Sequence, residues 1–448
     1  MIFKRKKIGV ISLGCDKNRV DTEKMLTLLG HENITQDITE AQIIIINSCA
    51  FLESSRKEAI DTVLECNEYR ENGVLEKIVL TGCLPQKFIG ELFDDFTEVD
   101  MFLGINDYEL LPEAIERAYN GERVNLVGAK KTFETQKRVV TTPLHYAYLK
   151  IADGCNNHCT YCLIPAIRGR YRSEKIEDLA TEAENLGELT ELILVAQDVT
   201  RYGEDLYGEK SLVRLIKELS KLENIGSIRL LYAYPDCLTD DLIDEIANND
   251  KVVKYLDIPL QHADDAVLKR MNRKGSGESY LALIEKLREK VKGIAIRSTF
   301  IAGFPGETEE QFENLVGFLE KAKLNNAGFF AYSREEGTPA YKLDGQLSEK
   351  TKNERVKKLY AIQKKISAEI LKSYVGKTIE VTADGIDYDK ERFFGRAYFS
   401  APDIDGKVYF TSDFDVNQGE KYNVLIKRSN SYELFGEVTR CIYQTNSL

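Results

Sequence analysis

Short aliphatic runs alternate with helix-like stretches along most of this 448-residue chain, and this alternation restricts the folds it can adopt. The runs are rich in Ile, Val and Leu, which is typical of strands buried on both faces of a sheet. Such strands belong to parallel sheets, because the helices that connect parallel strands cover the faces of the sheet. The sequence therefore predicts the α/β class.

Residues 1–125 predict a doubly wound parallel sheet whose strands each end in a cysteine. The aliphatic runs are 8–14, 43–48 and 78–82, the cysteines that follow them are Cys15, Cys49 and Cys83, and helix-like stretches lie near 21–30 and 53–71. Consecutive cysteines of this trio are 34 residues apart. Because the carboxyl ends of parallel strands meet in the ligand crevice of such sheets, we expect the three sulfurs to converge.

Residues 145–373 predict a partial (β/α) barrel, open on one side, with its chemistry at the carboxyl ends of the strands. The candidate strands are 146–152, 192–196, 227–232, 254–258, 294–300 and 327–331, and the candidate helices lie near 174–188, 211–222, 239–248, 278–291, 309–322 and 349–372. Thr308 and Gln311 form a capping-box pattern at the start of one of these helices.

Two other segments complete the predicted organisation. Residues 126–144 are polar and mixed, and they read as a linker. Residues 374–448 contain five short β-rich runs separated by Gly and Asp turns, which predicts a small OB-like β-barrel. This last domain has 12 acidic and 9 basic residues, so it is a poor candidate for nonspecific RNA binding.

The length of the hydrophobic runs, the cysteine content and the net charge indicate the compartment, the chemistry and the kind of partner. The longest aliphatic run is far shorter than the ~20 residues that span a bilayer, so we expect a cytoplasmic chain with no membrane segment and no signal peptide. Nine cysteines in a long intracellular chain favour metal or redox chemistry over a disulfide framework. The net charge of −12 favours a basic partner.

The sharpest motif is the loop 154–162 (GCNNHCTYC), directly after the first predicted barrel strand. Its spacing lets Cys155, Cys159 and Cys162 bind one iron–sulfur cluster, and because clusters usually take four thiolates, one iron stays open for another ligand. The alternative is a zinc loop with a distant fourth ligand such as His158 or Cys237. The trio of Cys15, Cys49 and Cys83 has no local motif, and it reads as a second cluster site or as three small buried side chains.

The cysteine loop at the first strand of a βα barrel resembles the radical S-adenosylmethionine superfamily. This resemblance implies that Cys155, Cys159 and Cys162 are catalytic cluster ligands and that the open iron chelates S-adenosylmethionine. It also places Tyr161 near the adenine, with core packing as its alternative. Gln197 and Gln261 follow barrel strands and are candidate cofactor contacts or strand-end caps, and Arg297 is a candidate contact or part of an internal salt bridge.

The order of the three domains resembles the methylthiotransferase family, in which the C-terminal barrel is called TRAM, and the likeness covers nearly the whole chain. The matching motifs are 12–18 (SLGCDKN), 154–159 (GCNNHC), 196–198 (AQD), 258–262 (IPLQH) and 303–308 (GFPGET). The family resemblance implies two 4Fe-4S clusters, the second on Cys15, Cys49 and Cys83. It also implies a reducing electron donor.

Several stretches resemble the branch of this family called RimO, which modifies an aspartate of the small-subunit ribosomal protein twelve. They are 12–18, 255–262, 331–338 and 395–406. Asp16 and Arg334 depart from this pattern, since proline is common at both positions. An acidic enzyme suits a basic ribosomal protein.

The resemblance implies the following reaction. A deoxyadenosyl radical takes a hydrogen from the aspartate β-carbon, which then attacks a methylated sulfur held at the N-terminal cluster, and a second S-adenosylmethionine supplies the methyl group. The alternatives are the same chemistry on a tRNA adenosine and, from another class, a non-catalytic iron–sulfur electron carrier or scaffold. A carrier normally gives its clusters four protein ligands and needs no large barrel.

Overall fold

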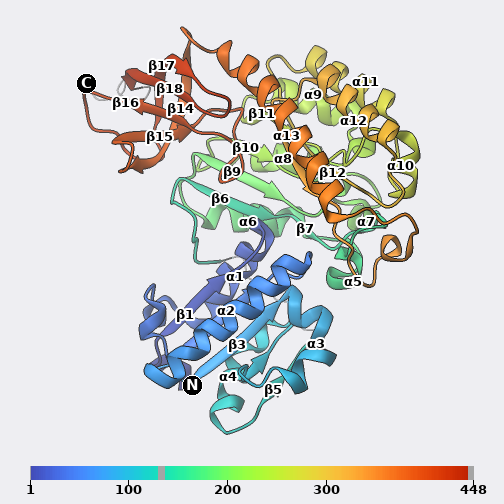
Figure 1. Ribbon diagram of the computed structural model, residues 1–448. Helices are drawn as coiled ribbons and strands as arrows, with labels where there is room; N and C mark the ends of the chain where they lie inside the picture. Colours follow the sequence, from blue (N-terminus) through green and yellow to red (C-terminus); the bar gives the residue numbers. More distant parts are fainter. Residues whose placement is uncertain (1, 130–136, 442–448) are drawn as a thin grey trace.

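The computed structural model describes residues 2–129 and 137–441, and it arranges them in three parts (Figure 1). The N-terminal part is a parallel sheet, the central part is a second and larger parallel sheet, and the C-terminal part is a small barrel. The middle of the predicted linker, residues 130–136, and the end of the predicted C-terminal barrel domain, residues 442–448, lie outside the described residues. No helix of the described residues is long and apolar enough to cross a membrane.

The N-terminal sheet is built from five parallel strands in the order β1-β2-β3-β4-β5. Its elements are β1 (Ile8–Ser12), α1 (Asp16–Leu29), β2 (Ile43–Ser48), α2 (Glu53–Asn72), β3 (Lys77–Gly82), α3 (Cys83–Asp95), β4 (Met101–Phe102), α4 (Leu111–Tyr119) and β5 (Val124–Asn125). A parallel bridge joins Ile8 to Ile34 on the side of β1 away from β2. The chain therefore leaves β1 in one direction and returns to β2 in the other, which is the reversal of a doubly wound sheet.

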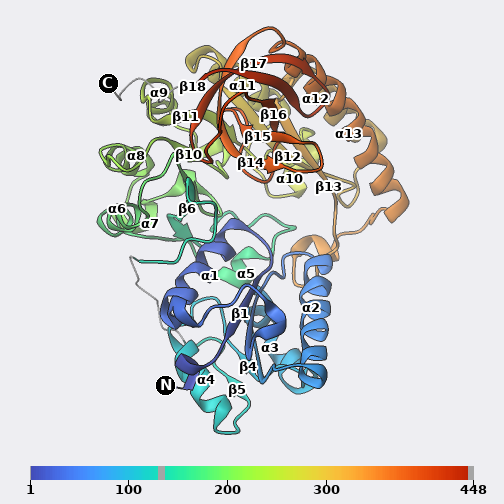
Figure 2. The same ribbon diagram turned by 90° about the vertical axis from the view of Figure 1, so that its left-hand side faces the viewer.

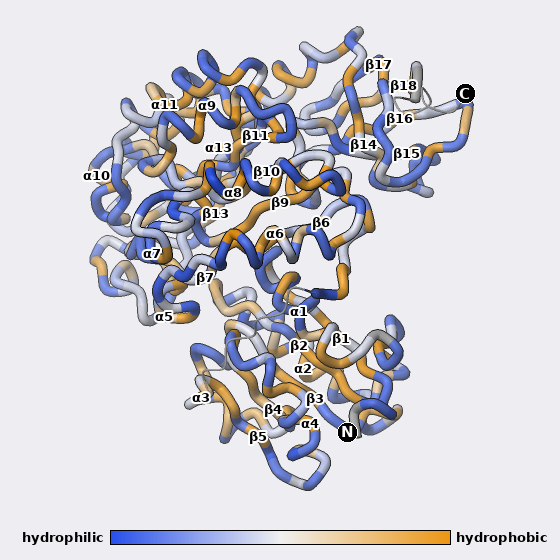
Figure 3. Tube along the Cα trace, turned by 180° about the vertical axis from the view of Figure 1, so that it is seen from behind, coloured by the Kyte–Doolittle hydropathy of each residue, from blue (hydrophilic) through white to orange (hydrophobic). Residues whose placement is uncertain are grey.

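Opposite winding directions place α1 and α2 on opposite faces of the sheet, because parallel crossovers are right-handed. Figure 2 shows these two helices on either side of β1. The aliphatic residues of β2 and β3 are fully buried between the helices, and Figure 3 shows both strands as hydrophobic segments. The doubly wound prediction is confirmed, and each cysteine of the N-terminal trio directly follows the strand end or the short turn after it.

The central sheet has six strands, all parallel, in the order β13-β12-β11-β10-β9-β6. The strands are β6 (Tyr146–Lys150), β9 (Glu191–Val195), β10 (Ile228–Leu230), β11 (Val252–Asp257), β12 (Ala295–Ala302) and β13 (Asn326–Ala331). The main helices are α6 (Ile176–Asn185), α8 (Leu212–Leu219), α9 (Asp240–Asn248), α11 (Gly277–Lys290), α12 (Glu309–Ala322) and α13 (Glu349–Lys372). Because β6 and β13 are not paired with each other, the barrel is open, as predicted.

Smaller elements shape the ends of the central strands. They are β7 (Ala152–Asp153), α5 (Ile164–Arg168), β8 (Arg172–Ser173), α7 (Glu204–Tyr207) and α10 (Asp265–Arg270). The predicted capping box is present at α12, where the Thr308 side chain accepts from the Gln311 N–H and the Gln311 side chain accepts from the Thr308 N–H.

The C-terminal part is a closed five-stranded barrel in the order β14-β15-β16-β18-β17, which confirms the predicted fold of this segment. Its strands are β14 (Thr378–Asp387), β15 (Arg392–Arg396), β16 (Val408–Thr411), β17 (Lys421–Ser429) and β18 (Leu434–Cys441). A buried ion pair joins it to the central barrel. Glu191, the first residue of β9, lies between Arg229 at 2.9 Å and Arg396 at 3.1 Å.

This buried carboxylate makes stability depend on pH. Burial raises the pKa of Glu191, but the guanidinium groups of Arg229 and Arg396 outweigh it and lower the pKa from its ordinary 4.5 to about 2. The folded-state pKa lies below the unfolded-state value. The ionised carboxylate therefore stabilises the fold above about pH 4.5, and the contribution is lost as the pH falls toward 2.

We expect Glu191→Gln to lower the free energy of unfolding by roughly 3 kcal/mol at pH 7, because two buried guanidinium groups lose their counter-charge. The difference from wild type should shrink as the pH falls below 4.5, which urea denaturation at pH 7 and pH 3.5 measures. Glu437→Gln is the matched control. The pair that Glu437 forms with Lys427 is half exposed, so the variant should change stability by less than about 0.5 kcal/mol. A difference in stability between the Glu191 variant and wild type that does not change with pH would contradict the lowered pKa of Glu191.

Candidate active site

The cysteine loop of the central barrel is held in a tight turn beyond β6 and β7. Gly154 has a φ of +75°, and a Cβ there would lie 2.1 Å from the Arg170 carbonyl oxygen, so only glycine fits. Backbone N–H groups then approach two of the sulfurs: Asn157 donates to Cys155 at 3.4 Å and Ile164 donates to Cys162 at 3.4 Å. Such N–H donors favour thiolates, which are the form that binds metal.

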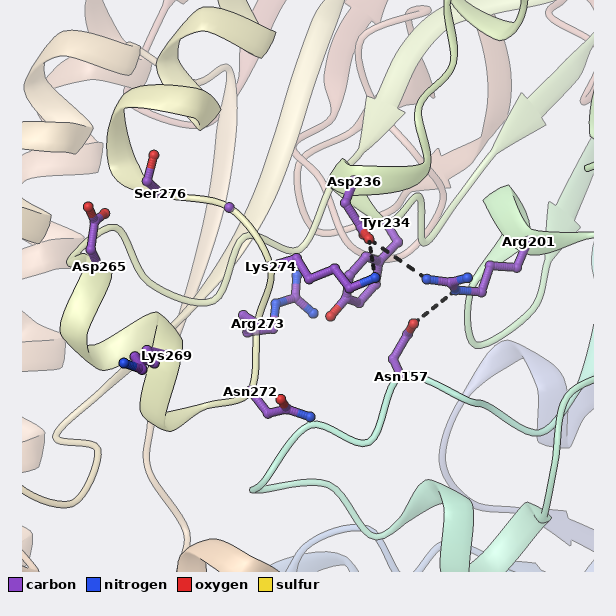
Figure 4. A pocket seen from close by; sticks show the side chains of 11 residues that line it. Asn157, Arg201, Tyr234, Asp236, Asp265, Lys269, Asn272, Arg273, Lys274 and Ser276 are labelled. Carbon is purple, nitrogen blue, oxygen red and sulfur yellow. Dashed lines mark hydrogen bonds and ion pairs between the residues drawn. The ribbon is translucent and has the colours of Figure 1, made fainter.

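The third sulfur of the loop lies against one aromatic and one cationic side chain. Cys159 Sγ is 3.7 Å from the Tyr234 hydroxyl and 3.9 Å from the Arg273 guanidinium, which stacks 4.1 Å over the Tyr234 ring. Both side chains also line a pocket of about 420 Å³ (Figure 4). The figure shows Arg201, Lys269 and Lys274 around the same pocket. The rim also carries Asp236, which pairs with Arg201 and Lys274 at 3.8 Å each, so Cys159 is one side chain away from a cavity with charges of both signs.

The N-terminal trio converges at the start of α1, as the strand-end argument predicts. Asn18 Oδ1 lies 3.8 Å from Cys15 Sγ and 4.0 Å from Cys83 Sγ. A Cβ on Gly14 would lie 3.4 Å from Cys49 Sγ, so the third sulfur is beside the turn that carries Cys15. Gly14 has a φ of +101°, and its turn places the chain after β1 directly against the end of β2.

Burial raises the pKa of four of these thiols, those of Cys49, Cys83, Cys155 and Cys162. It raises the pKa of Cys83 to about 12, although the Arg168 charge acts in the opposite direction. It raises the pKa of Cys155 to about 11 and that of Cys162 to about 12. Buried thiols that approach one another in trios are chemically suited to a cluster, whose irons stabilise the thiolate form.

A cluster and a single zinc ion place different demands on three cysteine sulfurs. Within residues 2–129 and 137–441, no group of three or more His, Cys, Asp and Glu side chains is arranged around one metal position. In an iron–sulfur cluster each thiolate binds a different iron, so the three sulfurs need not meet at a point. His158, the alternative fourth zinc ligand, is exposed, whereas Cys237 is buried beside Cys159 and Tyr234.

One buried arginine joins the two cysteine trios. Arg168, at the end of α5, is 2% exposed, and it donates to Cys83 Sγ at 3.6 Å and to Asn18 Oδ1 at 2.6 Å. On its other side it pairs with Asp153 at 3.0 Å, whose carboxylate accepts from the Gly154 N–H at 2.8 Å. A continuous chain of hydrogen bonds therefore runs from Cys83 to the residue that precedes Cys155.

Further charges complete this network. Asp21 of α1 pairs with Arg168 at 3.3 Å and with Lys150 of β6, and Lys150 also pairs with Asp153 at 3.3 Å. Burial raises the pKa of Asp153, but Arg168 and Lys150 outweigh it and hold the pKa well below its usual range. Two buried cations and two buried carboxylates are thus balanced between the N-terminal and central sheets.

The predicted cofactor contacts differ in their surroundings. Both polar atoms of the Gln197 side-chain amide are buried and have no partner among the described residues, which suits a polar ligand at the end of β9. Tyr161 is packed among apolar side chains and beside Cys159. Gln261 has a φ of +72°, and its backbone is paired with β12. Arg297 forms the internal salt bridge, with Asp257 at 3.0 Å and Asp405 at 3.5 Å.

Three side chains beside the cysteines were missed by the sequence analysis: Tyr234, Arg168 and Arg273. The basic residues at 168–172 directly after the cysteine loop gave a signal for Arg168. Tyr234 and Arg273 come from loops after other strands, 75 and 114 residues from Cys159, and only the folded chain brings them to its sulfur.

Sequence comparisons agree with this architecture. The chain matches the Radical SAM superfamily over residues 149–319, the Uncharacterized protein family UPF0004 over residues 7–104 and the TRAM domain over residues 375–439. A relative from Clostridium botulinum (strain Eklund 17B / Type B), named Ribosomal protein uS12 methylthiotransferase RimO, is 47% identical and covers 96% of this chain and 98% of its own. A relative of the same name from Clostridium tetani (strain Massachusetts / E88) is 45% identical with the same coverage.

Solved structures show the same fold at low sequence identity. The radical S-adenosylmethionine methyltransferase TsrM from Kitasatospora setae, with cobalamin and a 4Fe-4S cluster bound, has a TM-score of 0.55 at 14% identity, covering 75% of this chain and 77% of its own. The cobalamin-dependent S-adenosylmethionine radical enzyme OxsB has a TM-score of 0.51 at 13% identity, covering 81% of this chain and 56% of its own.

The open parallel barrel, the cysteine loop after its first strand and the superfamily match define a radical S-adenosylmethionine enzyme. Relatives 45% and 47% identical over almost the whole chain refine this class. The chain belongs to the RimO family of methylthiotransferases, and it is an enzyme that transfers a methylthio group.

Removing the arginine that joins the two trios should destabilise the chain strongly. We expect Arg168→Gln to lower the free energy of unfolding of the metal-free chain by about 3–5 kcal/mol, because it leaves the buried carboxylates of Asp21 and Asp153 undercompensated. Asp153→Asn in the same chain should recover part of the loss. Urea denaturation of the single and double variants measures both effects.

Arg117→Gln is the control for this pair of variants. Its ion pair with Glu122 is largely exposed, so we expect a change below about 1 kcal/mol. Equal losses for the Arg168 and Arg117 variants, or no recovery in the double variant, would show that the buried network does not hold the two sheets together.

Proposed function

We propose that this enzyme inserts a methylthio group at the β-carbon of an aspartate in the ribosomal protein uS12, with two 4Fe-4S clusters and S-adenosylmethionine. The observation that carries the proposal is the pair of cysteine trios, each with three thiols, joined through Arg168 between two parallel sheets. The names of the curated relatives support the substrate. We further propose cytoplasmic ribosomal subunits as the place of action and a reducing protein as electron donor.

The two trios have distinct roles in this proposal. Cys155, Cys159 and Cys162 hold the catalytic cluster, and Cys15, Cys49 and Cys83 hold the cluster that carries the sulfur to be transferred. When bound, the first cluster and S-adenosylmethionine supply a one-electron cleavage of the cofactor that yields a carbon-centred radical. The chain orients these groups through the N–H donors of Asn157 and Ile164.

Several polar side chains are proposed as contacts of S-adenosylmethionine. The unpartnered amide of Gln197 suits the polar amino-acid part of the cofactor, and Tyr161 beside Cys159 suits its adenine. Gln261 lies beyond the end of β11, which β10 separates from β9. The Arg297 guanidinium is paired with Asp257 and Asp405, so in this proposal it contacts the cofactor while it keeps these two carboxylate partners.

The substrate is tested by mass spectrometry of ribosomal proteins from cells with and without the gene. We expect uS12 to lose the mass of one methylthio group in the cells that lack it. An unchanged uS12 together with loss of a methylthioadenosine from hydrolysed tRNA would shift the substrate to tRNA. No change in either would overturn the proposed function.

The assignment of the two trios is tested with a matched pair of cysteine variants. Cys159→Ala should abolish cleavage of S-adenosylmethionine, measured as release of 5′-deoxyadenosine. Cys49→Ala should retain that cleavage and lose sulfur insertion, because its thiol belongs to the other trio. If Cys49→Ala still inserts sulfur, the N-terminal trio is not a cluster site for this reaction. If S-adenosylmethionine leaves the spin-resonance signal of the reduced wild-type cluster unchanged, the non-catalytic alternative is favoured.

A further inference from the structure

Lys17 is a buried cation beside the N-terminal trio. It stands two residues after Cys15 in the first turn of α1 and is 7% exposed. Its ammonium lies 3.6 Å from the centre of the Tyr232 ring, which belongs to the loop after β10 in the central barrel. Lys17 therefore lies where the N-terminal trio faces the carboxyl ends of the barrel strands.

In the parts of the chain that the structure describes, Lys17 forms no ion pair within 4 Å, although Asp257 is near enough that the Lys17 charge acts against the burial that raises the Asp257 pKa. The neighbouring carboxylates have other partners. Asp16 accepts a hydrogen bond from the Tyr232 hydroxyl at 2.9 Å, and Asp257 pairs with Arg297 at 3.0 Å. Tyr232 itself has a φ of +65°, an unfavourable conformation for a bulky residue.

The Lys17 ammonium has no ion-pair partner of its own within 4 Å among the described residues, and a single ring face compensates only part of the cost of holding a charge among buried side chains. The other buried cations between these two sheets, Arg168 and Lys150, each have a carboxylate partner. Lys17 is thus a strong candidate for binding an anion that the free chain does not contain.

We propose that Lys17 binds the carboxylate of the target aspartate and thereby selects aspartate as the residue to be modified. This inference rests on the proposed function and names the contact that recognises its substrate. In an aspartate the carboxyl carbon is bonded directly to the β-carbon. A β-carbon that receives sulfur from the Cys15 trio therefore brings its carboxylate to that trio, where Lys17 supplies the positive charge.

The contact has a measurable consequence for specificity. A charge-assisted hydrogen bond in a buried site contributes enough to change affinity by roughly 10- to 100-fold. An asparagine at the target position has the same shape and no charge. Wild-type enzyme should therefore bind a uS12 loop peptide with aspartate roughly 10- to 100-fold more tightly than the same peptide with asparagine.

The test is a cycle of two peptides and four proteins, with dissociation constants measured by fluorescence anisotropy on the cluster-loaded chain and again on the metal-free chain. Lys17→Met and Lys17→Gln should bind both peptides with equal, weak affinity, and Lys17→Gln keeps most of the aliphatic stem if the Met variant fails to fold. Lys24→Met is the matched control on the same helix. Lys24 pairs with Glu182 at 3.4 Å, so its removal should leave the aspartate preference intact.

The outcomes separate this inference from the proposed function. If wild type modifies the aspartate peptide and Lys17→Gln keeps the full preference for it over asparagine, the role of Lys17 is wrong and the proposed function stands. If wild type neither binds nor modifies the aspartate peptide while it modifies tRNA, both are overturned. Loss of the preference in the two Lys17 variants, with the preference kept in Lys24→Met, supports the inference.

Discussion

The buried ion network around Arg168 is the interaction on which the relation between the two sheets depends. Asp21 comes from α1 of the N-terminal part, and its partners Arg168 and Lys150, together with Asp153, come from the central part. Charges of this kind repay the cost of leaving water only when every partner is in place. The network therefore favours a single arrangement of the N-terminal and central parts, and this arrangement sets the separation between the two cysteine trios.

The same network explains why the trios face each other. In both sheets the cysteines stand at the carboxyl ends of parallel strands, where polar backbone groups are left over and ligands bind. Arg168 donates to a sulfur of one trio, and Asp153 accepts from the N–H of Gly154 beside the other. A hydrogen-bonded path of two side chains is short enough that a shift of either sheet would disturb both cysteine sites.

Elements that bury apolar side chains could be predicted from the sequence. Elements that bury polar side chains could not. The six central strands and the capping box at Thr308 follow hydrophobic and capping patterns that are local in sequence. The helix expected near 21–30 begins at Asp16, because its first turns bury Lys17, Asn18 and Asp21 against the barrel and thus lack an apolar stripe. The helix α3 was not expected, since Pro85 and Gly90 interrupt its pattern and the backbone kinks at Phe88.

The candidate site shows the same division. Its six cysteines were predictable because strand ends and loop spacing are sequence properties, whereas Tyr234 and Arg273 reach Cys159 from distant loops. The net charge of −12 for the whole chain does not describe the charges beside the cysteine sites. Arg168 and Arg273 each approach a cysteine sulfur, and Lys17 stands two residues after Cys15, so cations accompany both cysteine sites. A negative whole-chain charge suits a basic protein substrate, whereas the individual cations beside the cysteine sites suit anionic groups, so the two observations describe different parts of recognition.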